Sequence, residues 1–232
     1  MHERKLIKTE DGSFTIFIPE WNESYHSKHG AVREAIHVFI ENGLNKIESK
    51  KQLSVLEIGF GTGLNAFLTY LAGNEQKVLI DYSGIEKYPL DSQEYELLGY
   101  QKAVVEFVDK SIFSETELNS IYLKIMMAEW NEFQVISQNF RLRKIQADFL
   151  EFNYPENEFD LVYFDAFGAR VQPELWTEKI FSKICCSMKT GGLLTTYSSK
   201  GSVRRALTEL GFEVEKLAGP PGKREMINAV KK

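Results

Sequence analysis

Cysteine is scarce in this chain. Its 232 residues include only two cysteines, Cys185 and Cys186, which are neighbours in the sequence. Adjacent positions are poorly suited to an ordinary structural disulfide, and the pair lacks the spacing of a zinc site. We therefore exclude a disulfide framework, expect no metal centre, and predict that both thiols are core residues in a reducing compartment.

Long apolar runs and a strong charge of either sign are also missing. No stretch approaches the roughly 20 apolar residues of a membrane span. Residues 1–10 carry charges throughout, where a signal peptide would have an apolar core. These absences predict a cytoplasmic protein. The net charge of −5 lacks the basic excess of many nucleic-acid binders, although a local basic face can coexist with an acidic total.

From residue 53 onward, short apolar strands alternate with helical stretches. Such alternation predicts a Rossmann-like α/β fold, with a mostly parallel sheet and helices on both faces. Strands are predicted at residues 53–58, 78–86, 141–148, 159–167, 192–198, 212–217 and 224–230. Helices are predicted at residues 64–71, 174–188 and 201–210.

The first part of the chain follows a different pattern. Residues 5–10 and 13–18 are predicted to be two strands of a hairpin, joined by an Asp-Gly turn, and residues 30–41 have apolar side chains at helical spacing. We assign residues 1–44 to a hairpin and helix extension packed on the core, and residues 45–232 to the catalytic domain.

Between the second and third predicted strands lies a long segment, residues 86–141, that is partly helical and rich in aromatic side chains. Its periodicity does not resolve an arrangement. We expect an insertion that caps an edge of the sheet.

Residues 57–63 read Glu-Ile-Gly-Phe-Gly-Thr-Gly and stand between a predicted strand and a predicted helix. Glycine lets the chain turn sharply and lets a ligand approach the backbone. A turn that merely needs glycine is the alternative, but the strand and helix on either side favour a nucleotide cofactor. Leu64 stands where the dinucleotide fingerprint has its third glycine, and Glu57 precedes the loop as in methyltransferases. The loop therefore favours S-adenosylmethionine over a nicotinamide cofactor.

Carboxylates follow the predicted strands, at the edge where open α/β sheets bind their ligands. Glu86 is placed to accept hydrogen bonds from ribose hydroxyls. Asp148 is expected to accept from the adenine amino group while Phe149 covers the ring. Asp165 directly follows an apolar strand and should face the reactive end of the cofactor, where partial desolvation would raise its pKa. The alternative for each aspartate is a turn or helix cap.

Several further blocks narrow the interpretation. They are Tyr25-His26-Ser27, Gly30-Ala31 with Glu34, the glycine loop through Asn65, Ile85-Glu86-Lys87-Tyr88-Pro89-Leu90, Asp165-Ala166-Phe167, the stretch 197–205 and Lys223-Arg224-Glu225-Met226. Together they resemble the MnmC/MnmD-type methyltransferases, which form 5-methylaminomethyl-2-thiouridine at the tRNA wobble position. The resemblance covers nearly the whole chain. Where this family often has Asp-Gly-Phe-Ala-Pro, the chain has Asp-Ala-Phe-Gly-Ala from residue 165.

This resemblance implies methyl transfer from S-adenosylmethionine to the primary amine of 5-aminomethyl-2-thiouridine in tRNA. It implies no flavin, because the flavin-dependent domain of the bifunctional members would follow the present chain. The catalytic residues would be Asp165, which holds or takes the amine proton, and Tyr25, near the acceptor or the methionine end. The residues expected to bind the cofactor are Glu57, Gly59, Gly61, Gly63, Asn65, Glu86, Lys87, Asp148, Phe149 and Asp165.

Basic residues in three groups are candidates for contact with tRNA phosphates, although solvated surface charge explains such groups equally well. They are Arg141, Arg143 and Lys144, then Lys200, Arg204 and Arg205, and then Lys223 and Arg224. Two other functions remain open. One is a methyltransferase for a small-molecule amine, and the other is a nucleotide-binding or RNA-binding module without catalysis.

Overall fold

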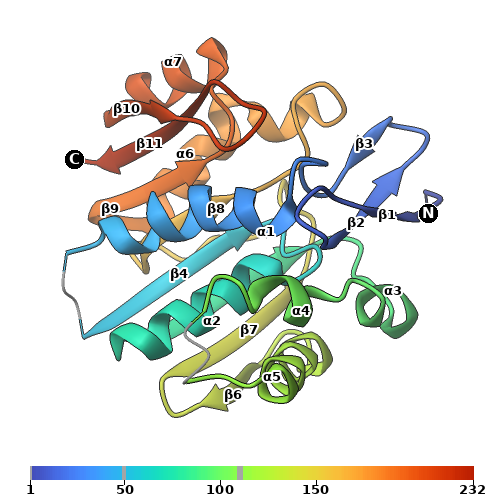
Figure 1. The fold of residues 1–232 in the computed structure, drawn as a ribbon. Coiled ribbons are helices and arrows are strands. Elements are labelled where there is room, and N and C mark those ends of the chain that lie inside the picture. The colour runs from blue at the N-terminus through green and yellow to red at the C-terminus, as the bar shows by residue number, and fades with distance from the viewer. Residues whose placement is uncertain (1, 49–50, 109–111) are drawn as a thin grey trace.

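The computed structural model describes residues 2–48, 51–108 and 112–232. Its largest feature is a sheet of eight strands, which confirms the predicted α/β fold (Figure 1). In spatial order the strands are β10 (Phe212–Ala218), β11 (Glu225–Lys231), β9 (Met188–Thr196), β8 (Phe159–Phe164), β4 (Gln52–Ile58), β5 (Leu79–Glu86), β7 (Phe140–Gln146) and β6 (Phe133–Ser137).

The centre of this sheet is parallel and its margins are mixed. Strands β9, β8, β4, β5 and β7 pair in parallel, whereas β6 is antiparallel to β7 and β11 is antiparallel to β9 and β10. All six residues of β8 are buried, as a parallel strand covered on both faces requires. The carboxyl ends of the parallel strands therefore meet at one edge of the sheet.

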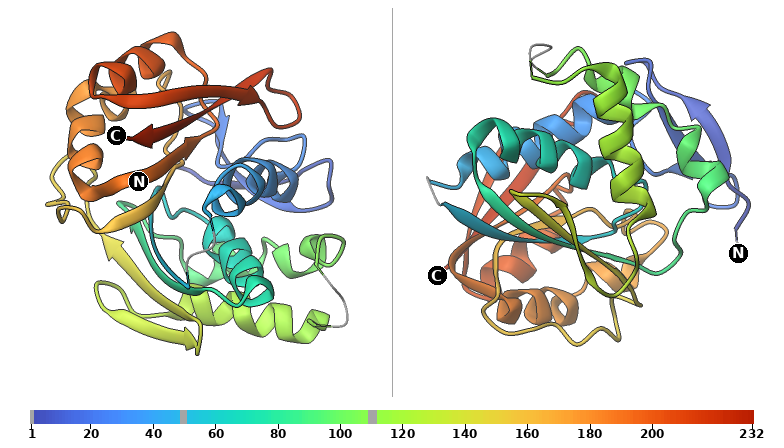
Figure 2. Two further views of the ribbon diagram at one scale, coloured as in Figure 1. Left: turned by 90° about the vertical axis from the view of Figure 1, so that its left-hand side faces the viewer. Right: turned by 90° about the horizontal axis from the view of Figure 1, so that it is seen from below.

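Helices cover both faces (Figure 2). On one face α2 (Leu64–Gln76) packs with α1 (Ala31–Ala35) and the π-helical turn η1 (Ile36–Glu41) that continues it. The other face carries η3 (Pro173–Trp176), α6 (Glu178–Ser187) and α7 (Gly201–Glu209). Alternate residues of the strands supply the two cores, because successive side chains of a strand point to opposite faces.

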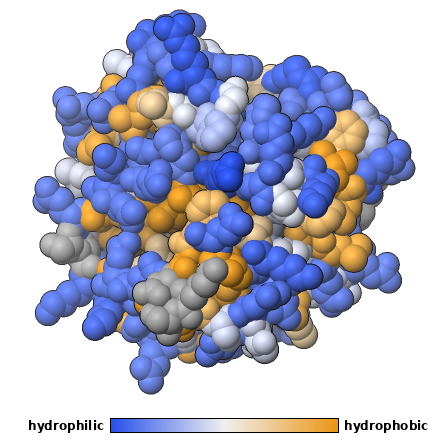
Figure 3. Space-filling view, in the orientation of Figure 1, coloured by the Kyte–Doolittle hydropathy of each residue, from blue (hydrophilic) through white to orange (hydrophobic). Residues whose placement is uncertain are grey.

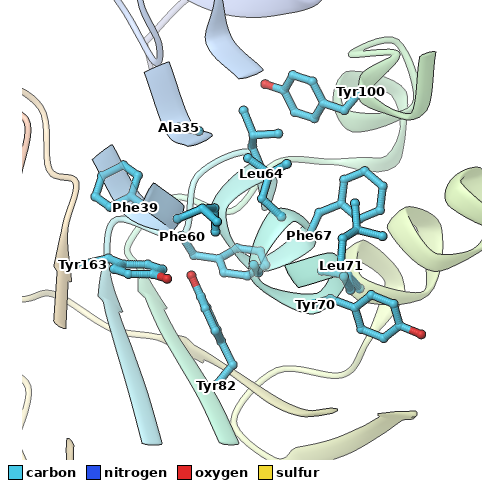
Figure 4. Packing of buried hydrophobic residues seen from close by; sticks show 14 of the residues in the cluster. Ala35, Phe39, Phe60, Leu64, Phe67, Tyr70, Leu71, Tyr82, Tyr100 and Tyr163 are labelled. Carbon is cyan, nitrogen blue, oxygen red and sulfur yellow. The ribbon is translucent and has the colours of Figure 1, made fainter. Parts of the chain in front are cut away.

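The first core contains many aromatic rings (Figure 4). Side chains of α2, including Leu64 and Phe67, lie over rings from the sheet such as Tyr82 and Tyr163. Phe39 of η1 meets Tyr163 with 5.0 Å between ring centroids. The N-terminal helix is thus fixed to the sheet by apolar packing.

The predicted N-terminal hairpin is confirmed, and it is larger than expected. Strands β1 (Lys5–Lys8) and β2 (Phe14–Ile18) pair antiparallel, and β3 (Glu23–Ser24) adds a third short strand. A short 3₁₀ turn, η2 (Leu44–Lys46), then leads toward β4. Figure 1 shows this small sheet beside the carboxyl ends of the central strands. The surface in that view is mainly hydrophilic, with an apolar area on the side of the small sheet (Figure 3).

The insertion between β5 and β7 does more than cap an edge. It forms α3 (Ser92–Glu96), α4 (Tyr100–Val104) and α5 (Glu115–Met127), and then β6, which extends the sheet. Helix α5 contacts α4, α2 and β6. Residues 109–111 of the insertion lie outside the described residues, as do residues 1 and 49–50.

The cysteines do not both lie in the core. Cys186 of α6 is exposed and Cys185 is partly exposed, so the prediction of two core thiols was wrong. The pair lies on an amphipathic helix whose apolar face is carried by Ile180, Phe181 and Ile184. No helix in the described ranges has the length and apolar character of a membrane span. The division of the chain at residue 44 stays a prediction.

Candidate active site

A cavity of about 600 Å³ lies at the carboxyl ends of the parallel strands. Its floor comes from the segments that follow β4, β5, β7 and β8, as expected for ligand sites in open α/β sheets. The N-terminal extension supplies one wall, through residues such as Tyr25 and Glu34. Tyr197 after β9 and Lys223 before β11 supply another. The site therefore joins parts of the chain that are nearly 200 residues apart.

The glycine loop after β4 adopts the conformation that its sequence predicts. Gly59 and Gly61 have φ angles of 95° and 49°, in the region that favours glycine. A Cβ on Gly59 would lie 2.6 Å from the Asp165 carbonyl oxygen, and one on Gly61 would lie 3.1 Å from Cδ1 of Tyr25. The two glycines therefore let the Asp165 carbonyl and the Tyr25 ring pack directly against the loop, and both glycines line the cavity.

Gly63 lies at the end of the loop, where α2 begins, and its contact with a cofactor stays a prediction. It precedes α2 with a φ of 71°, and a Cβ there would collide with Sδ of Met126 in the insertion. Gly63 is not among the residues that line the cavity. Its small size allows α2 to pack against α5.

Glu86 ends β5 and is buried beside the loop. Its carboxylate accepts hydrogen bonds from the backbone N–H of Gly61 at 3.0 Å and of Tyr88 at 2.8 Å. Burial raises the pKa of Glu86, and these two amide donors oppose the rise. The carboxylate lines the cavity, where the remaining lone pairs suit ribose hydroxyls.

Asp148 lies in the turn after β7, together with Phe149. Lys87 Nζ lies 2.6 Å from Oδ2 of Asp148, and the Leu150 N–H donates to Oδ1 at 2.9 Å. Burial opposes ionisation, but the Lys87 ammonium and the Leu150 amide lower the pKa of Asp148 below its usual value. All three predicted residues, Lys87, Asp148 and Phe149, line the cavity. The hydrogen bond from the Leu150 N–H is the kind of contact that an aspartate makes in a turn, which was the alternative explanation for Asp148.

Asp165 follows β8 and lies deep in the cavity, with its side chain partly exposed to it. The Asn65 amide group donates both to Asp165 Oδ2 and to Glu57 Oε1, each at 2.8 Å. Burial raises the pKa of Asp165 to about 8. Glu34 adds to this rise, whereas the Asn65 hydrogen bond and Lys223 oppose it. Asp165 is thus a carboxyl group that exchanges its proton near neutral pH.

Glu57 lies beneath the loop and does not line the cavity. Tyr82 donates a hydrogen bond to its Oε2 at 2.8 Å. Burial and the nearby Asp165 raise the pKa of Glu57 well above its usual value. Glu57 therefore holds Asn65, which in turn donates to Asp165, and direct contact of Glu57 with the cofactor stays a prediction.

The loop and its neighbours fit S-adenosylmethionine. A buried polar atom, Oδ1 of Asn65, has no hydrogen-bond partner within the described residues, and Asn65 lines the cavity. Buried polar atoms are rarely left without a partner, so this oxygen calls for a polar ligand. An amide oxygen beside a carboxylate suits a ligand ammonium group, such as that of the methionine moiety.

Aromatic rings form the wall opposite the loop. Phe167 meets Tyr25 and Trp21 edge to face, with centroid separations of 4.9 and 5.1 Å. Tyr197 donates a hydrogen bond to the Ala166 carbonyl at 2.8 Å. Burial raises the pKa of Tyr25, so its hydroxyl stays protonated. Tyr25 is thus a wall residue over Gly61 that can donate a hydrogen bond but does not act as a base.

His26 lines the cavity and is held in place by Thr15. Its Nδ1 lies 3.2 Å from Oγ1 of Thr15, and its backbone N–H donates to the same oxygen. Burial lowers the pKa of His26 to about 4, so the ring is neutral at physiological pH.

Glu34 and Arg4 are among the cavity residues that received no role from the sequence. Glu34 of α1 is buried, and Lys223 Nζ lies 2.6 Å from its Oε1. Arg4 of the N-terminal extension donates to the Tyr88 carbonyl at 2.6 Å and to Glu94 at 2.9 Å. Glu34 belongs to one of the sequence blocks that carry the family resemblance, and this membership was the only indication in the sequence that it belongs to the site. Arg4 had none, because its partners are more than 80 residues away.

Two of the basic candidates for RNA contact are turned inward. Lys144 is buried, with Nζ against the Met126 carbonyl and over the Trp130 ring, so it is not available at the surface. Lys223 lines the cavity and pairs with Glu34. Lys144 is therefore not available at the surface, whereas Lys223 keeps 35% of its side chain exposed and its contact with RNA stays a prediction.

The other basic candidates lie in two places. Arg141 is near the start of β7 and pairs with Asp81, at the opposite edge of the sheet from the cavity. Arg143 contacts Ser83 and Glu158. Four remaining residues lie around α7 and the β10–β11 turn, where they are partly or fully exposed: Lys200, Arg204, Arg205 and Arg224.

A family model described as S-adenosyl-L-methionine-dependent methyltransferase matches residues 114–232. Among curated proteins, the chain is similar to the "tRNA 5-methylaminomethyl-2-thiouridine biosynthesis bifunctional protein MnmC" of Nitrosospira multiformis, with 26% identity over 91% of the chain and 34% of that protein. The protein of the same name from Marinobacter nauticus is 29% identical over 90% of the chain and 34% of its own length. The chain thus spans about a third of the length of these relatives.

Among solved structures, the chain is similar to the crystal structure of MNMC2 from Aquifex aeolicus. The TM-score is 0.75 with 25% identity, and the match covers 100% of this chain and 72% of that one. The similarity therefore includes the N-terminal extension as well as the parallel sheet.

Proposed function

Because the chain belongs to the S-adenosyl-L-methionine-dependent methyltransferase family, we propose that it methylates the primary amine of 5-aminomethyl-2-thiouridine at the wobble position of tRNA. The observation that carries this proposal is Asp165, a carboxyl group with a pKa of about 8 that lines the cavity beside the glycine loop. The printed names of the MnmC relatives supply the nucleoside.

The acceptor needs a free lone pair, and a primary alkyl amine is largely protonated at neutral pH. A carboxylate that takes the ammonium proton would raise the reactive fraction, and a pKa near the working pH suits that task. Asp165 accepts this proton, and the aromatic wall of Tyr25, Phe167 and Tyr197 excludes bulk water. S-adenosylmethionine, when bound, supplies an already activated methyl group. The remaining work of the protein is alignment, which contributes about 7–11 kcal/mol in well-oriented systems.

The cofactor would be held by the loop and by the groups at the strand ends. Glu86 faces the ribose, Asp148 and Phe149 the adenine, and Asn65 the methionine moiety. Because Gly59 and Gly61 have no Cβ, the Asp165 carbonyl and the Tyr25 ring pack closely on the loop that would hold the cofactor.

We also propose that tRNA phosphates contact the α7 group, which we define as Lys200, Arg204, Arg205 and Arg224. The hydrogen bond from Lys216 is the largest cause that lowers the pKa of Glu225, and Arg224 and Arg204 both add to it, so both guanidinium groups act on the same end of this hairpin. Arg204 and Arg205 also border a shared hollow on α7. Because tRNA is met in the cytoplasm, we expect the protein there.

The direct test is transfer of labelled methyl groups to bulk tRNA from cells that lack this protein. Wild-type protein should label the tRNA, and nucleoside mass analysis should show the aminomethyl nucleoside replaced by its methylaminomethyl product. Small primary amines, tested at equal amine concentration, separate the proposal from a small-molecule methyltransferase. Labelling of the small amines without labelling of tRNA would overturn the proposed substrate.

A further inference from the structure

The acceptor side of the cavity contains an ion pair that the proposed reaction has not used. Lys223 Nζ lies 2.6 Å from Oε1 of Glu34, and the Ser27 N–H donates to the other oxygen, Oε2, at 2.7 Å. Only 10% of the Glu34 side chain and 35% of the Lys223 side chain are exposed. Burying most of the Glu34 carboxylate is unfavourable unless the carboxylate is paired and hydrogen-bonded, as it is here by Lys223 and Ser27. The pair is therefore unlike an ordinary solvated ion pair on the surface, and its position in the cavity needs an explanation.

Lys223 also connects the pair to the catalytic segment. Its ammonium lies 3.8 Å from the centroid of the Tyr197 ring, a cation–π contact. The Tyr197 hydroxyl in turn donates to the carbonyl of Ala166, the residue after Asp165. A continuous set of contacts thus runs from α1, through the turn before β11, to the end of β8.

The pair joins two segments that must meet to close the cavity. Glu34 belongs to the N-terminal extension and Lys223 to the β10–β11 turn. Other contacts hold the same junction. His37 Nε2 lies 2.8 Å from the Ala218 carbonyl oxygen, and Gly222 packs so closely on the His29 ring that a Cβ there would collide with it.

We propose that Glu34 and Lys223 form a positioning pair that fixes the acceptor wall of the cavity and balances the charge that faces Asp165. This inference rests on the proposed function, in which Asp165 takes the amine proton. Without Lys223, a cavity already rich in carboxylates would hold one more uncompensated negative charge. Without Glu34, an unpaired ammonium would face the site that must receive a cationic amine.

Several surrounding elements supply groups that either shift the pKa of Asp165 or have their own pKa raised by it. These groups are Glu57 from β4, Asn65 from α2, Tyr82 from β5, Tyr100 from α4, Glu34 from α1, Tyr197 after β9, and Lys223 before β11. Among these described groups Lys223 is the only cation. Burial has the largest effect on the pKa of Asp165, and then Glu34 raises it while Lys223 lowers it.

The test is the pH profile of methyl transfer to amine-bearing tRNA. In wild-type protein the rate should rise through a midpoint near the Asp165 pKa of about 8. Glu34→Gln leaves Lys223 unpaired, so the midpoint should fall by about one unit. The double variant Glu34→Gln/Lys223→Met removes both charges and should return the midpoint toward the wild-type value. Lys216→Met, which breaks a surface pair with Glu225 on the same hairpin, should leave the midpoint unchanged.

A second readout requires no turnover. The carbon-13 shift of the Asp165 carboxyl group, followed against pH in cofactor-free protein, should show the same displacements. If Glu34→Gln does not fold, Lys223→Met takes its place. In Lys223→Met, Glu34 is still held by the Ser27 amide but has lost its cation, so the midpoint of the Asp165 titration should move upward. Equal midpoints in wild type and in whichever single variant is measured would overturn the positioning pair.

Asp165→Asn separates this inference from the proposed function. If Asp165→Asn keeps wild-type turnover at every pH, the proposed proton acceptor fails, and the carbon-13 titration still decides the inference. If Asp165→Asn abolishes turnover while Glu34→Gln leaves the midpoint in place, the inference alone fails.

Discussion

Asp165 shows how a single residue can serve function while it weakens stability. It follows a fully buried strand and is held by the Asn65 amide, yet burial raises its pKa to about 8. A carboxyl group with a pKa above its unfolded value binds more protons in the folded state. Its contribution to the free energy of unfolding is therefore complete below pH ~4 and is lost progressively as the pH rises to about 8.

We predict that Asp165→Asn raises the Tm, and that the gain is larger at pH ~9 than at pH ~5, because the variant has no charge to bury. The same substitution should reduce methyl transfer about 100-fold or more, the usual contribution of a general base. Differential scanning calorimetry at the two pH values and single-turnover assays measure both effects. An equal change in Tm at the two pH values would contradict the buried ionisation.

Gly59 illustrates a second requirement on a single residue. Its φ of 95° is unfavourable for other residues, and a Cβ would lie only 2.6 Å from the Asp165 carbonyl oxygen. We predict that Gly59→Ala lowers the free energy of unfolding by more than the roughly 1–3 kcal/mol of backbone strain, and weakens cofactor binding. Gly211→Ala is the matched control, because Gly211 has a φ of 87° and no atom lies within 4 Å of the position that a Cβ would take. Both free energies of unfolding can be measured by urea denaturation. Equal losses in Gly59→Ala and Gly211→Ala would show that backbone strain alone matters and that the contact with the Asp165 carbonyl does not.

At the scale of whole elements, the N-terminal extension makes hydrogen bonds to the segment that follows β5. Arg4 donates to the Tyr88 carbonyl and to Glu94, beyond the residue Lys87 that pairs with Asp148. We predict that Arg4→Ala weakens binding of S-adenosylmethionine about tenfold, the equivalent of one hydrogen bond to a charged group, because the segment 86–88 is then without its outer support. Isothermal titration calorimetry measures the change. Lys5→Ala is the control, since Lys5 is exposed and pairs only with Glu3 among the described contacts, and an equal weakening in this control would contradict the prediction.

The elements also differ in how well the sequence predicted them. The apolar pattern predicted the strands of the sheet and the helices that cover it to within a few residues. Burial of the sheet on both faces requires apolar side chains at these positions, so the pattern is visible in the sequence. The insertion between β5 and β7 was not resolved, because α3 and α4 are each only five residues long. Its final strand, β6, is held by pairing with β7, which is not visible in local sequence.

For the molecule as a whole, net charge and local charge give different expectations. The protein carries −5 overall, yet the α7 group gathers basic residues at one end of the sheet. We predict that Arg204→Ala/Arg205→Ala weakens tRNA binding and reduces the slope of log K against log salt concentration by about one for each phosphate that the variant no longer neutralises. Lys46→Ala, an exposed lysine before β4, is the control. Filter binding across a salt series measures the slopes, and identical slopes in all three proteins would argue against the α7 group.

The fold class, the glycine loop and the carboxylates at strand ends could all be inferred from the sequence. Those features follow from apolar periodicity and from the need for residues without a Cβ, and both can be recognised within a short stretch of sequence. It took the folded chain to show that Glu57 supports Asn65 instead of facing the cavity, that Lys144 is buried, and that Lys223 pairs with Glu34. Charge alone does not show whether a lysine meets water or a carboxylate, because its partner can lie 189 residues away.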